Sequence, residues 1–317
     1  MSESAGHVPV LLREAVRLLV TDPRGTYVDV TLGGGGHSVA ILQEAGMDAR
    51  VIGMDCDPAA VERVRRTPPA LAPAFTAVRA RFSELETALD SLGIEAVDGI
   101  LADLGLSSIQ LDDPVRGLSY DREGPLDMRL DPARPETADS LVGSADEGTI
   151  AGWLSEYGEL PRARAAARAV RRAREQAGRL TTRALRDALI PLYPGPARSR
   201  RLAQAFQALR MVVNHEIEEL RALLDAAARV VRPGGTLVVI AYHSLEDRMV
   251  KQAFRPPRPL DAWVEPAPEP WEPITPKPIR PGDEETAENP RAGSARLRAA
   301  RRRPGVPAPA AREGGWS

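Results

Sequence analysis

The chain has 317 residues, of which 43% are hydrophobic and 27% are charged, and its formal net charge at pH 7 is −2. These values predict a folded protein with one large domain or two smaller ones, and they exclude a chain that is disordered throughout. Cys56 is the only cysteine, which excludes an internal disulfide framework and a cysteine-based zinc site and favours a reducing compartment. The sequence shows no signal-peptide pattern and no run of 18 apolar residues, which predicts a cytoplasmic protein without a membrane span.

Short β-type runs alternate with helix-like segments over the first hundred residues. The runs cover residues 27–31, 50–54, 75–78 and 97–101, and the strongest strand pattern of the chain comes much later, at 236–242. Alternation of this kind predicts parallel strands joined by crossover helices, which places the chain in the α/β class.

Four consecutive glycines, Gly33 to Gly36, stand where the first run ends and the next helix begins. Glycine allows positive φ and a close approach of the backbone to a ligand, and a helix start offers unpaired N–H groups. We therefore expect a nucleotide or a carboxylate ligand at this loop. The alternative is a glycine-rich turn of an α/β protein that binds nothing.

Two later runs end in an aspartate. Asp55 follows the second run, 22 positions beyond Gly33, a spacing at which a carboxylate reaches the ribose hydroxyls of a bound nucleotide. Asp103 ends the fourth run and precedes Ser107 and Ser108. Because ligands of open α/β sheets bind beyond the carboxyl ends of the strands, these side chains are candidate ligand contacts. The alternatives are a solvated aspartate at a helix start and an ordinary turn with a serine helix cap.

The regular alternation stops between residues 113 and 200, where loops and helices are predicted as an insertion into the sheet. Arginine is concentrated there and near the C-terminus, with thirteen arginines from 158 to 210 and seven from 291 to 312. Two basic tracts in a nearly neutral chain indicate a polyanionic partner. For the arginine-rich helix at 162–174, the alternative is a solvated face whose alanines pack inward.

Ten prolines lie between residues 256 and 281, which excludes a regular helix or a central strand there. This segment is either an ordered meander or a mobile linker. Residues 294–303 are expected to form a last strand or a short helix, and residues 304–317 a disordered tail.

A glycine loop followed by strand-end acids fits either a dinucleotide or S-adenosylmethionine. A dinucleotide fingerprint G-x-G-x-x-G needs a third glycine, but Ser38 stands at that place when the count starts at Gly33. The segment instead resembles the first motif of S-adenosylmethionine-dependent methyltransferases, in which an acid inside the strand, here Asp29, precedes small residues and glycines.

Several longer motifs narrow this resemblance. They cover residues 7–16, 33–38, 103–113, 116–120, 124–129, 242–248 and 289–292. In this order they resemble the motifs of the bacterial 16S ribosomal RNA (cytosine-N4)-methyltransferases of the MraW or RsmH type. The resemblance implies a Rossmann-like class I methyltransferase sheet that binds S-adenosylmethionine, formed by residues 1–112 and 201–303. It also implies an inserted, mostly helical second domain for substrate recognition, residues 113–200.

The activity implied by this resemblance is methyl transfer from S-adenosylmethionine to the exocyclic N4 of a cytidine in the decoding region of 16S rRNA. The expected partner is therefore 16S rRNA or the small ribosomal subunit. The resemblance implies cofactor contacts by Gly34, Gly35, Gly36, His37, Asp55, Phe82, Asp103 and Gln110.

Catalysis on an amino group needs little side-chain chemistry beyond hydrogen-bond acceptors near N4, which favour a reactive nitrogen. Candidates come from Asp103, the two serines that follow it and the segment 242–244, and the shortlist is Asp103, Ser107 and His243. His243 is a base, a substrate contact or a structural hydrogen-bonding residue. The residues expected to contact RNA phosphates are Arg168, Arg171, Arg172, Arg291 and Arg296.

Other functions are compatible with the residues alone. They are a methyltransferase for another RNA base or for a protein, a nicotinamide-dependent oxidoreductase, and a non-catalytic RNA-binding protein. The sequence shows no evident metal-ligand cluster, and either a monomer or a homodimer is compatible with it. The chain departs from the family pattern at residues 197–205 and at Gly293, so the family's substrate contacts are not carried over to these two places.

Overall fold

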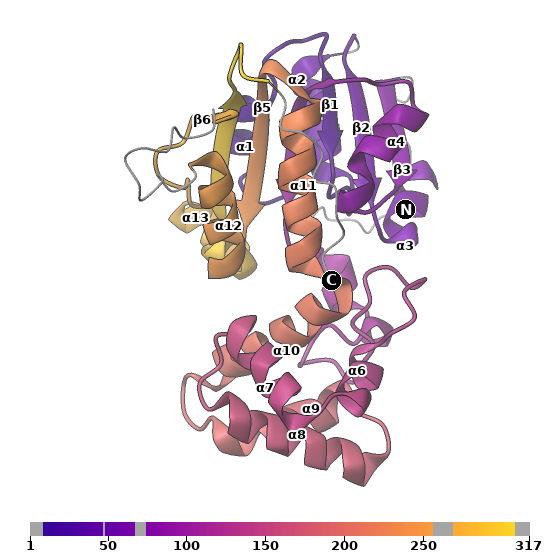
Figure 1. Ribbon diagram of the computed structural model, residues 1–317, viewed down its shortest axis with the longest axis vertical. Coiled ribbons are helices and arrows are strands. Elements are labelled where there is room, and N and C mark those ends of the chain that lie inside the picture. Colours follow the sequence, from indigo (N-terminus) through magenta and orange to yellow (C-terminus); the bar gives the residue numbers. More distant parts are fainter. Residues whose placement is uncertain (1–8, 47, 67–73, 256–268, 308–317) are drawn as a thin grey trace. The chain divides into compact units, whose positions relative to one another are not determined.

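The computed structural model describes residues 9–46, 48–66, 74–255 and 269–307 (Figure 1). It divides into two compact units. The first, here called the sheet unit, comprises Met1–Gly105 and Glu218–Ser317, and the second, the helical unit, comprises Leu106–Ile217. The end of the expected disordered tail, residues 308–317, and residues 256–268 of the proline-rich segment lie outside the described residues.

The sheet unit is built on seven strands in the order β3-β2-β1-β4-β5-β7-β6. The strands are β1 (Thr26–Asp29), β2 (Arg50–Asp55), β3 (Phe75–Arg79), β4 (Val97–Asp103), β5 (Val231–Ala241), β6 (Trp271–Pro273) and β7 (Arg296–Arg302). The first five strands pair parallel with one another, whereas β7 pairs antiparallel with both β5 and β6. This sheet with its crossover helices confirms the α/β class. The strand order reverses between β1 and β4, which is where ligands of such sheets bind.

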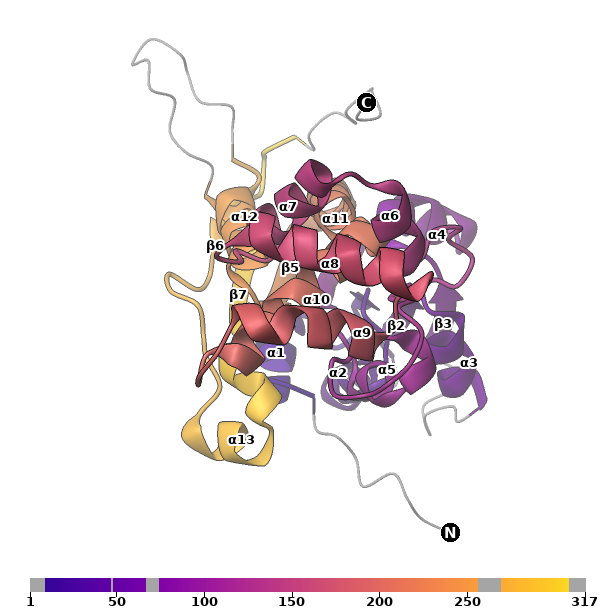
Figure 2. The ribbon, with the colours of Figure 1, turned by 90° about the horizontal axis from the view of Figure 1, so that it is seen from below.

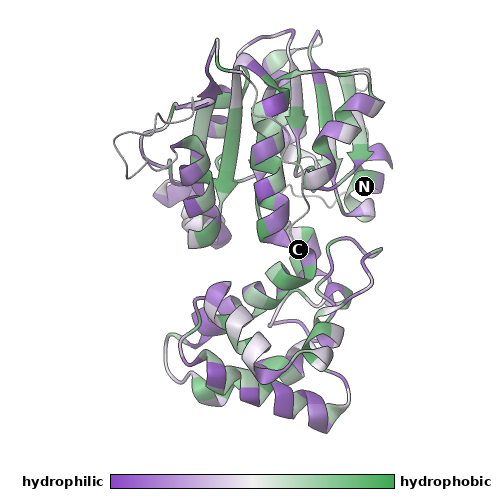
Figure 3. Cartoon of the chain, viewed as in Figure 1, coloured by the Kyte–Doolittle hydropathy of each residue, from purple (hydrophilic) through white to green (hydrophobic). Residues whose placement is uncertain are grey.

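Helices cover both faces of this sheet. They are α1 (Leu12–Leu19), α2 (Gly36–Ala45), α3 (Pro58–Arg66), α4 (Leu85–Ser91), α11 (Glu216–Val230), α12 (Ser244–Phe254) and α13 (Asp283–Glu288), with the short 3-10 helices η2 (Phe82–Glu84) and η5 (Pro290–Ser294). Because successive strand residues point to opposite faces of the sheet, the strands contribute side chains to two separate cores. Ile100 and Val239 pack with α4, α11 and α12, whereas Leu101 and Val238 pack with α1 and α2. Both faces are thus apolar, and Figure 3 shows the central strands largely in green.

Two details of the sheet differ from the simplest expectation. The strand pattern at 236–242 begins late, because β5 starts at Val231 and contains a bulge, where Val97 and Gly99 pair with Val231 and Thr236. The proline-rich segment contributes β6 at the edge of the sheet, where prolines leave the ladder least disturbed. Trp271 of β6 is buried, and its ring centroid lies 6.0 Å from that of Phe254.

The helical unit has its own apolar core. Its elements are α5 (Ser108–Asp112), η3 (Pro114–Arg116), α6 (Ala138–Ser144), α7 (Glu147–Glu156), α8 (Ala163–Ala177), α9 (Thr182–Leu189), η4 (Ile190–Leu192) and α10 (Arg198–Asn214). Its helices are labelled α5 to α10 in Figure 2. Its limits, Leu106 and Ile217, are wider than the expected 113 and 200. The reason is that α10 contacts α6 and α7 and buries Phe206 and Leu209 in this core.

Gly124 is a site where a single added methyl group should unfold part of the helical unit. A Cβ at Gly124 would lie 1.8 Å from the backbone oxygen of Pro114, which cannot move aside. We expect Gly124→Ala to destabilise the protein by at least about 2 kcal/mol. The matched control is Gly152→Ala on α7, where a Cβ meets nothing within 4 Å, so alanine should be neutral or stabilise by up to about 1 kcal/mol. Thermal unfolding followed by circular dichroism measures both, and equal melting temperatures for the two variants would contradict this.

Candidate functional site

Three aspartates lie at the carboxyl ends of neighbouring strands of the sheet unit. Asp29 ends β1, Asp55 ends β2 and Asp103 ends β4. These three strands are adjacent and parallel, so their carboxyl ends meet at one edge. This edge includes the reversal of strand order between β1 and β4, and the glycine loop leads from it into α2.

Asp29 holds the glycine loop from beneath. It is fully buried, and its Oδ1 accepts hydrogen bonds from the backbone N–H and the hydroxyl of Thr31, at 3.1 and 3.2 Å. Its Oδ2 accepts a 2.7 Å hydrogen bond from the hydroxyl of Ser38 on α2. The hydroxyl oxygen of Thr31 in turn accepts from the N–H of Asp103 at 2.7 Å. These bonds fix both ends of the loop, so Asp29 acts on the shape of the loop and leaves ligand contact to others.

The loop itself needs glycine at several places. Gly33 and Gly35 have φ of 49° and 83°, a region that residues with a Cβ rarely adopt. At Gly36, a Cβ would lie 2.4 Å from Cγ of Pro9, so the chain before α1 packs directly on the loop. Gly34 is exposed, and a Cβ there would meet nothing within 4 Å. The loop therefore offers an open backbone surface at Gly34 beside the start of α2.

Asp55 holds the far side of the loop and keeps acceptor capacity. Its Oδ2 accepts from the N–H of Gly33 and its Oδ1 from the N–H of Asp57, each at 2.9 Å. Burial raises the pKa of Asp55 from 3.8 to about 6, although these two backbone bonds act in the opposite direction. Each carboxylate oxygen has a second lone pair, so the side chain can also accept from a ligand hydroxyl.

Asp103 lies between a histidine and a tyrosine. Its Oδ1 accepts a 2.8 Å hydrogen bond from the hydroxyl of Tyr242, and its Oδ2 lies 3.7 Å from Nδ1 of His37. Burial raises the pKa of Asp103 from 3.8 to about 6, while His37 and Tyr242 lower it. Since 21% of its side-chain surface stays exposed, a ligand can still reach the carboxylate.

His37 is buried with its ring nitrogens poorly satisfied. Only 5% of the residue is exposed, and no hydrogen-bond partner for Nε2 is found among the described residues. A buried polar atom without a partner is costly, and such atoms are usually explained by a bound group. Phe82, at the start of η2, is partly buried and packs against the core.

The expected catalytic residue His243 serves first as a helix cap. It precedes α12, and its Nδ1 accepts from the N–H of Glu246 at 3.4 Å. Its Nε2 lies 3.0 Å from Oε1 of Glu246, although no well-aligned hydrogen bond joins the two atoms. In return, Oε2 of Glu246 accepts from the N–H groups of Tyr242 and His243, at 2.9 and 3.3 Å. This matches the structural role that the sequence left open for His243.

Ser107 and Gln110 belong to the helical unit, where they form a capping box. The hydroxyl of Ser107 accepts from the N–H of Gln110 at 3.2 Å, and Oε1 of Gln110 accepts from the N–H of Ser107 at 3.1 Å. These bonds satisfy two N–H groups at the start of α5. The helix cap that the sequence left open as an alternative for the serine is therefore present.

The expected RNA-contacting arginines differ in how they are engaged. On α8, Arg172 is exposed, and Arg168 is exposed in an ion pair with Glu147 at 3.2 Å. Arg171 is partly buried and donates to the carbonyl oxygen of Ala145. In the sheet unit, Arg291 is exposed on η5, whereas Arg296 is partly buried in an ion pair with Asp247 at 3.3 Å.

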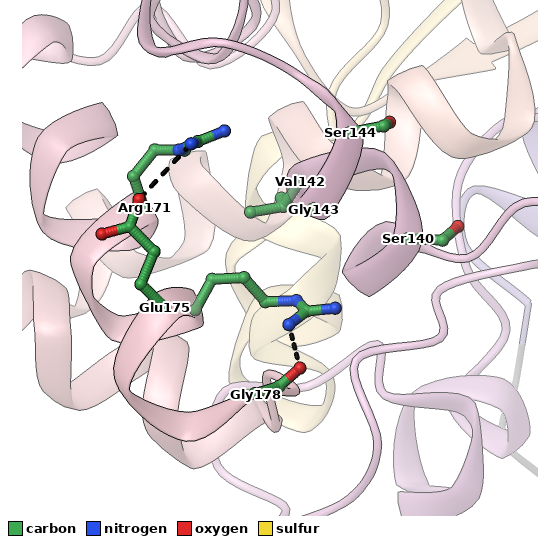
Figure 4. A pocket seen from close by; sticks show the side chains of 8 residues that line it. Ser140, Val142, Gly143, Ser144, Arg171, Glu175 and Gly178 are labelled. Atoms are coloured by element: carbon green, nitrogen blue, oxygen red, sulfur yellow. Dashed lines mark hydrogen bonds and ion pairs between the residues drawn. The ribbon is translucent and has the colours of Figure 1, made fainter.

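A surface pocket of the helical unit lies beside Arg171 (Figure 4). Arg174 also lines it, pairs with Asp139 at 2.6 Å and donates to the carbonyl oxygen of Gly178. Glu175 accepts from Arg171 at 3.3 Å. The guanidinium groups of Arg171 and Arg174 are thus already bound to groups of the protein itself. Their bonds connect α8 to neighbouring segments of the helical unit, so this pocket is not our candidate site.

One family model matches nearly the whole chain. The model of the MraW methylase family covers residues 4–303. The chain belongs to the MraW methylase family. A relative from Sorangium cellulosum, named ribosomal RNA small subunit methyltransferase H, is 47% identical over 299 residues, which cover 93% of this chain and 90% of the relative. Relatives of the same name from Anaeromyxobacter dehalogenans and Aromatoleum aromaticum are 45% and 44% identical over 94% and 96% of this chain, and over 98% and 100% of their own length.

Membership of the MraW methylase family confirms the resemblance found in the motifs, and it makes the protein a methyltransferase. Tyr242 belongs to the candidate segment 242–244 but was not on the shortlist of catalytic residues, and its hydroxyl contacts Asp103. No helix within the described residues of this MraW methylase is long and apolar enough to cross a membrane.

The raised pKa of Asp55 should appear in the stability of the protein. Folded Asp55 keeps its proton up to about pH 6, whereas the unfolded chain loses it near pH 3.8. Its contribution to stability is therefore present at low pH and is lost as the pH rises through this range. The asparagine side chain of the variant Asp55→Asn does not ionise, so the variant does not lose stability in this way. The unfolding free energy of the variant minus that of the wild type should therefore rise by about 2 to 3 kcal/mol between about pH 4 and pH 7.

Urea unfolding over this pH range measures the difference for Asp55→Asn and for Asp90→Asn, an exposed aspartate on α4 that serves as the control. The control should show a constant difference from the wild type. Parallel stability curves for wild type and Asp55→Asn would contradict the raised pKa.

Proposed function

We propose that this MraW methylase transfers the methyl group of S-adenosylmethionine to the exocyclic N4 of a cytidine in the decoding region of 16S rRNA. The observation that carries the proposal is the meeting of the glycine loop with Asp55, Asp103 and His37 at the point where the strand order reverses. The names of the relatives described above support a small-subunit rRNA substrate. The choice of cytosine N4 rests on the family resemblance of the motifs.

The residues at the sheet edge fit S-adenosylmethionine. The N–H groups at the start of α2, beside Gly34, Gly35 and Gly36, suit a carboxylate. Asp55 can accept from two ribose hydroxyls, as acids at the end of a second strand do in nucleotide sites. The ring of the partly buried Phe82 suits the face of an adenine. Nε2 of His37 is buried without a hydrogen-bond partner in the described parts of the chain, so it suits a polar group of a ligand.

S-adenosylmethionine supplies, when bound, a methyl group on a positively charged sulfur. The protein then has to orient the acceptor nitrogen and remove water from it. The cytosine N4 lone pair is delocalised into the ring, so a hydrogen-bond acceptor near the amino group favours attack. Among the three expected catalytic residues, Asp103 keeps Oδ2 without a hydrogen bond from Tyr242, whereas Ser107 and His243 each accept a capping bond. We therefore assign this acceptor role to Asp103.

The expected ligand contacts of Ser107 and Gln110 stay predictions. Both side chains hold the first turn of α5 in the helical unit. The helical unit as a whole is proposed to recognise the RNA, and the sheet unit to bind the cofactor.

The basic face of α8 is the part of the helical unit best suited to phosphates. Arg164, Arg168 and Arg172 are exposed and follow one another at intervals of four residues, which places them along one stripe of the helix. The ion pair of Arg168 with Glu147 is at the surface, where such pairs contribute little and exchange readily. Arg171 is bound to the protein backbone and Arg296 to Asp247, so both are weaker candidates, and Arg291 is an exposed one.

Methyl transfer into small ribosomal subunits tests the proposed function. Purified protein with labelled S-adenosylmethionine and unmethylated 30S subunits should yield N4-methylcytidine, identified by mass spectrometry of the nucleosides. Asp103→Asn should lower the rate by at least about 100-fold, because it weakens the acceptor near N4. The exposed control Asp90→Asn should keep the wild-type rate. A different methylated nucleoside, or none from a protein that binds S-adenosylhomocysteine, would overturn the proposal.

The salt dependence of RNA binding tests the role of α8. Replacing Arg164, Arg168 and Arg172 with alanine should reduce the slope of log affinity against log salt by about 2, because each lost phosphate contact removes about 0.7. The control replaces Arg17, Arg24 and Arg50, which are exposed on the sheet unit and change the net charge equally. Filter binding over a salt series measures both slopes, and equal slopes for the two triple variants would rule out the assignment of α8.

A further inference from the structure

Tyr242 is held rigidly at the carboxyl end of β5. Its backbone N–H donates to Oε2 of the buried Glu246 at 2.9 Å, which fixes the residue to the first turn of α12. Its ring lies over Gly105, where a Cβ would be 3.3 Å from Cδ2 of the tyrosine, and Gly105 has a φ of 112°. The backbone bond and the flat glycine surface together fix the direction of the side chain. That direction brings the hydroxyl to 2.8 Å from Oδ1 of Asp103.

The direction of this hydrogen bond is settled by chemistry. Burial and the neighbouring carboxylate of Asp103 both raise the pKa of Tyr242, so the phenol keeps its proton at neutral pH. Tyr242 therefore donates and Asp103 accepts. A hydrogen bond to the charged form of a carboxyl group favours that form.

Other groups around Asp103 have opposing effects. Asp29 from β1 and Glu246 from α12 add negative charge, and burial also opposes ionisation. His37 from α2 acts in the opposite direction. On the far side of the tyrosine, Glu285 from α13 adds a further negative charge. Tyr242 is thus a neutral donor in a strongly acidic surrounding, and it assists Asp103 without adding a charge that would compete with a cationic ligand.

We propose that Tyr242 is a positioning residue of this site. Its hydroxyl holds Asp103 through Oδ1 and favours the ionised carboxylate. Oδ2 stays beside His37, where it can accept a hydrogen bond from the bound cofactor or from the base that receives the methyl group. The role toward ligands rests on the proposed function. The effect on Asp103 does not, because it is a property of the protein alone.

The variant Tyr242→Phe removes the hydroxyl and keeps the ring over Gly105. In the protein without ligand, the carboxyl group of Asp103 should then titrate about one pH unit higher, the equivalent of a lost hydrogen bond to a charged group. Carbon-13 NMR of labelled aspartate follows the titration, and Asp103→Asn identifies the signal. An unchanged midpoint in folded Tyr242→Phe would overturn the proposal.

Tyr27→Phe is the matched control. Tyr27 is fully buried in the same unit, and its hydroxyl donates to the carbonyl oxygen of Asp22 at 2.7 Å, near the amino end of β1. This variant also loses a buried tyrosine hydrogen bond, but it should leave the titration of Asp103 unchanged. Should Tyr242→Phe fail to fold, 3-fluorotyrosine at position 242 serves instead. As a more acidic phenol it is a stronger donor, and it should move the midpoint of Asp103 to lower pH.

Calorimetric binding of S-adenosylhomocysteine across pH tests the ligand part of the proposal. The affinity of Tyr242→Phe should fall about fivefold below that of the wild type near pH 6 and match it within about twofold near pH 8, because Asp103 of the variant ionises at higher pH. A loss that is equal at both pH values would show a merely structural role and overturn the ligand part. A wild-type protein that binds no S-adenosylhomocysteine would defeat the proposed function, whereas the titration of Asp103 would still decide the role of Tyr242.

Discussion

The buried carboxylate of Asp29 is the interaction on which the rest of the site depends. A charge inside the fold is stable only when hydrogen bonds replace water, and Asp29 receives three, from the N–H and hydroxyl of Thr31 and from Ser38. These bonds fix the glycine loop. The hydroxyl oxygen of Thr31 also accepts a hydrogen bond from the N–H of Asp103, which ties the loop to the end of β4. The loop and the end of β4 are therefore one rigid assembly.

This assembly explains why Asp55 and Asp103 hold protons unusually well. Both are buried beside Asp29, and burial is the main cause that raises the pKa of each. The backbone N–H groups of Asp57 and Gly33 offset it only in part at Asp55, and His37, followed by the hydroxyl of Tyr242, offsets it only in part at Asp103. A ligand that brings hydroxyl, amino or cationic groups to these oxygens would complete their solvation, which fits the cofactor proposed for this MraW methylase.

Interpretation of single residues from the sequence was weakest where side chains serve helix starts or ion pairs. Ser107 and His243 were catalytic candidates with a helix cap and a structural role as their alternatives, and both cap helices. Their capping partners lie three positions further on, a spacing that the sequence shows. Arg296 belongs to a basic tract, yet Asp247, far from it in the sequence, binds it at 3.3 Å. No spacing rule connects two residues as distant as Arg296 and Asp247. The limits of the helical unit could not be predicted for the same reason, because α10 belongs to this unit through its packing on α6 and α7.

Short-range patterns by themselves determined the α/β class, the positions of the first four strands, the glycine loop and the family, because hydrophobic alternation, glycine conformation and long motifs are local properties of the chain. Only the tertiary structure decided that Asp29 supports the loop, that Tyr242 and His37 meet at Asp103, and which arginines are already bound. These facts depend on which strand ends become neighbours. That order, β3-β2-β1-β4-β5-β7-β6, is set by the joint burial of two apolar faces, to which the whole chain contributes.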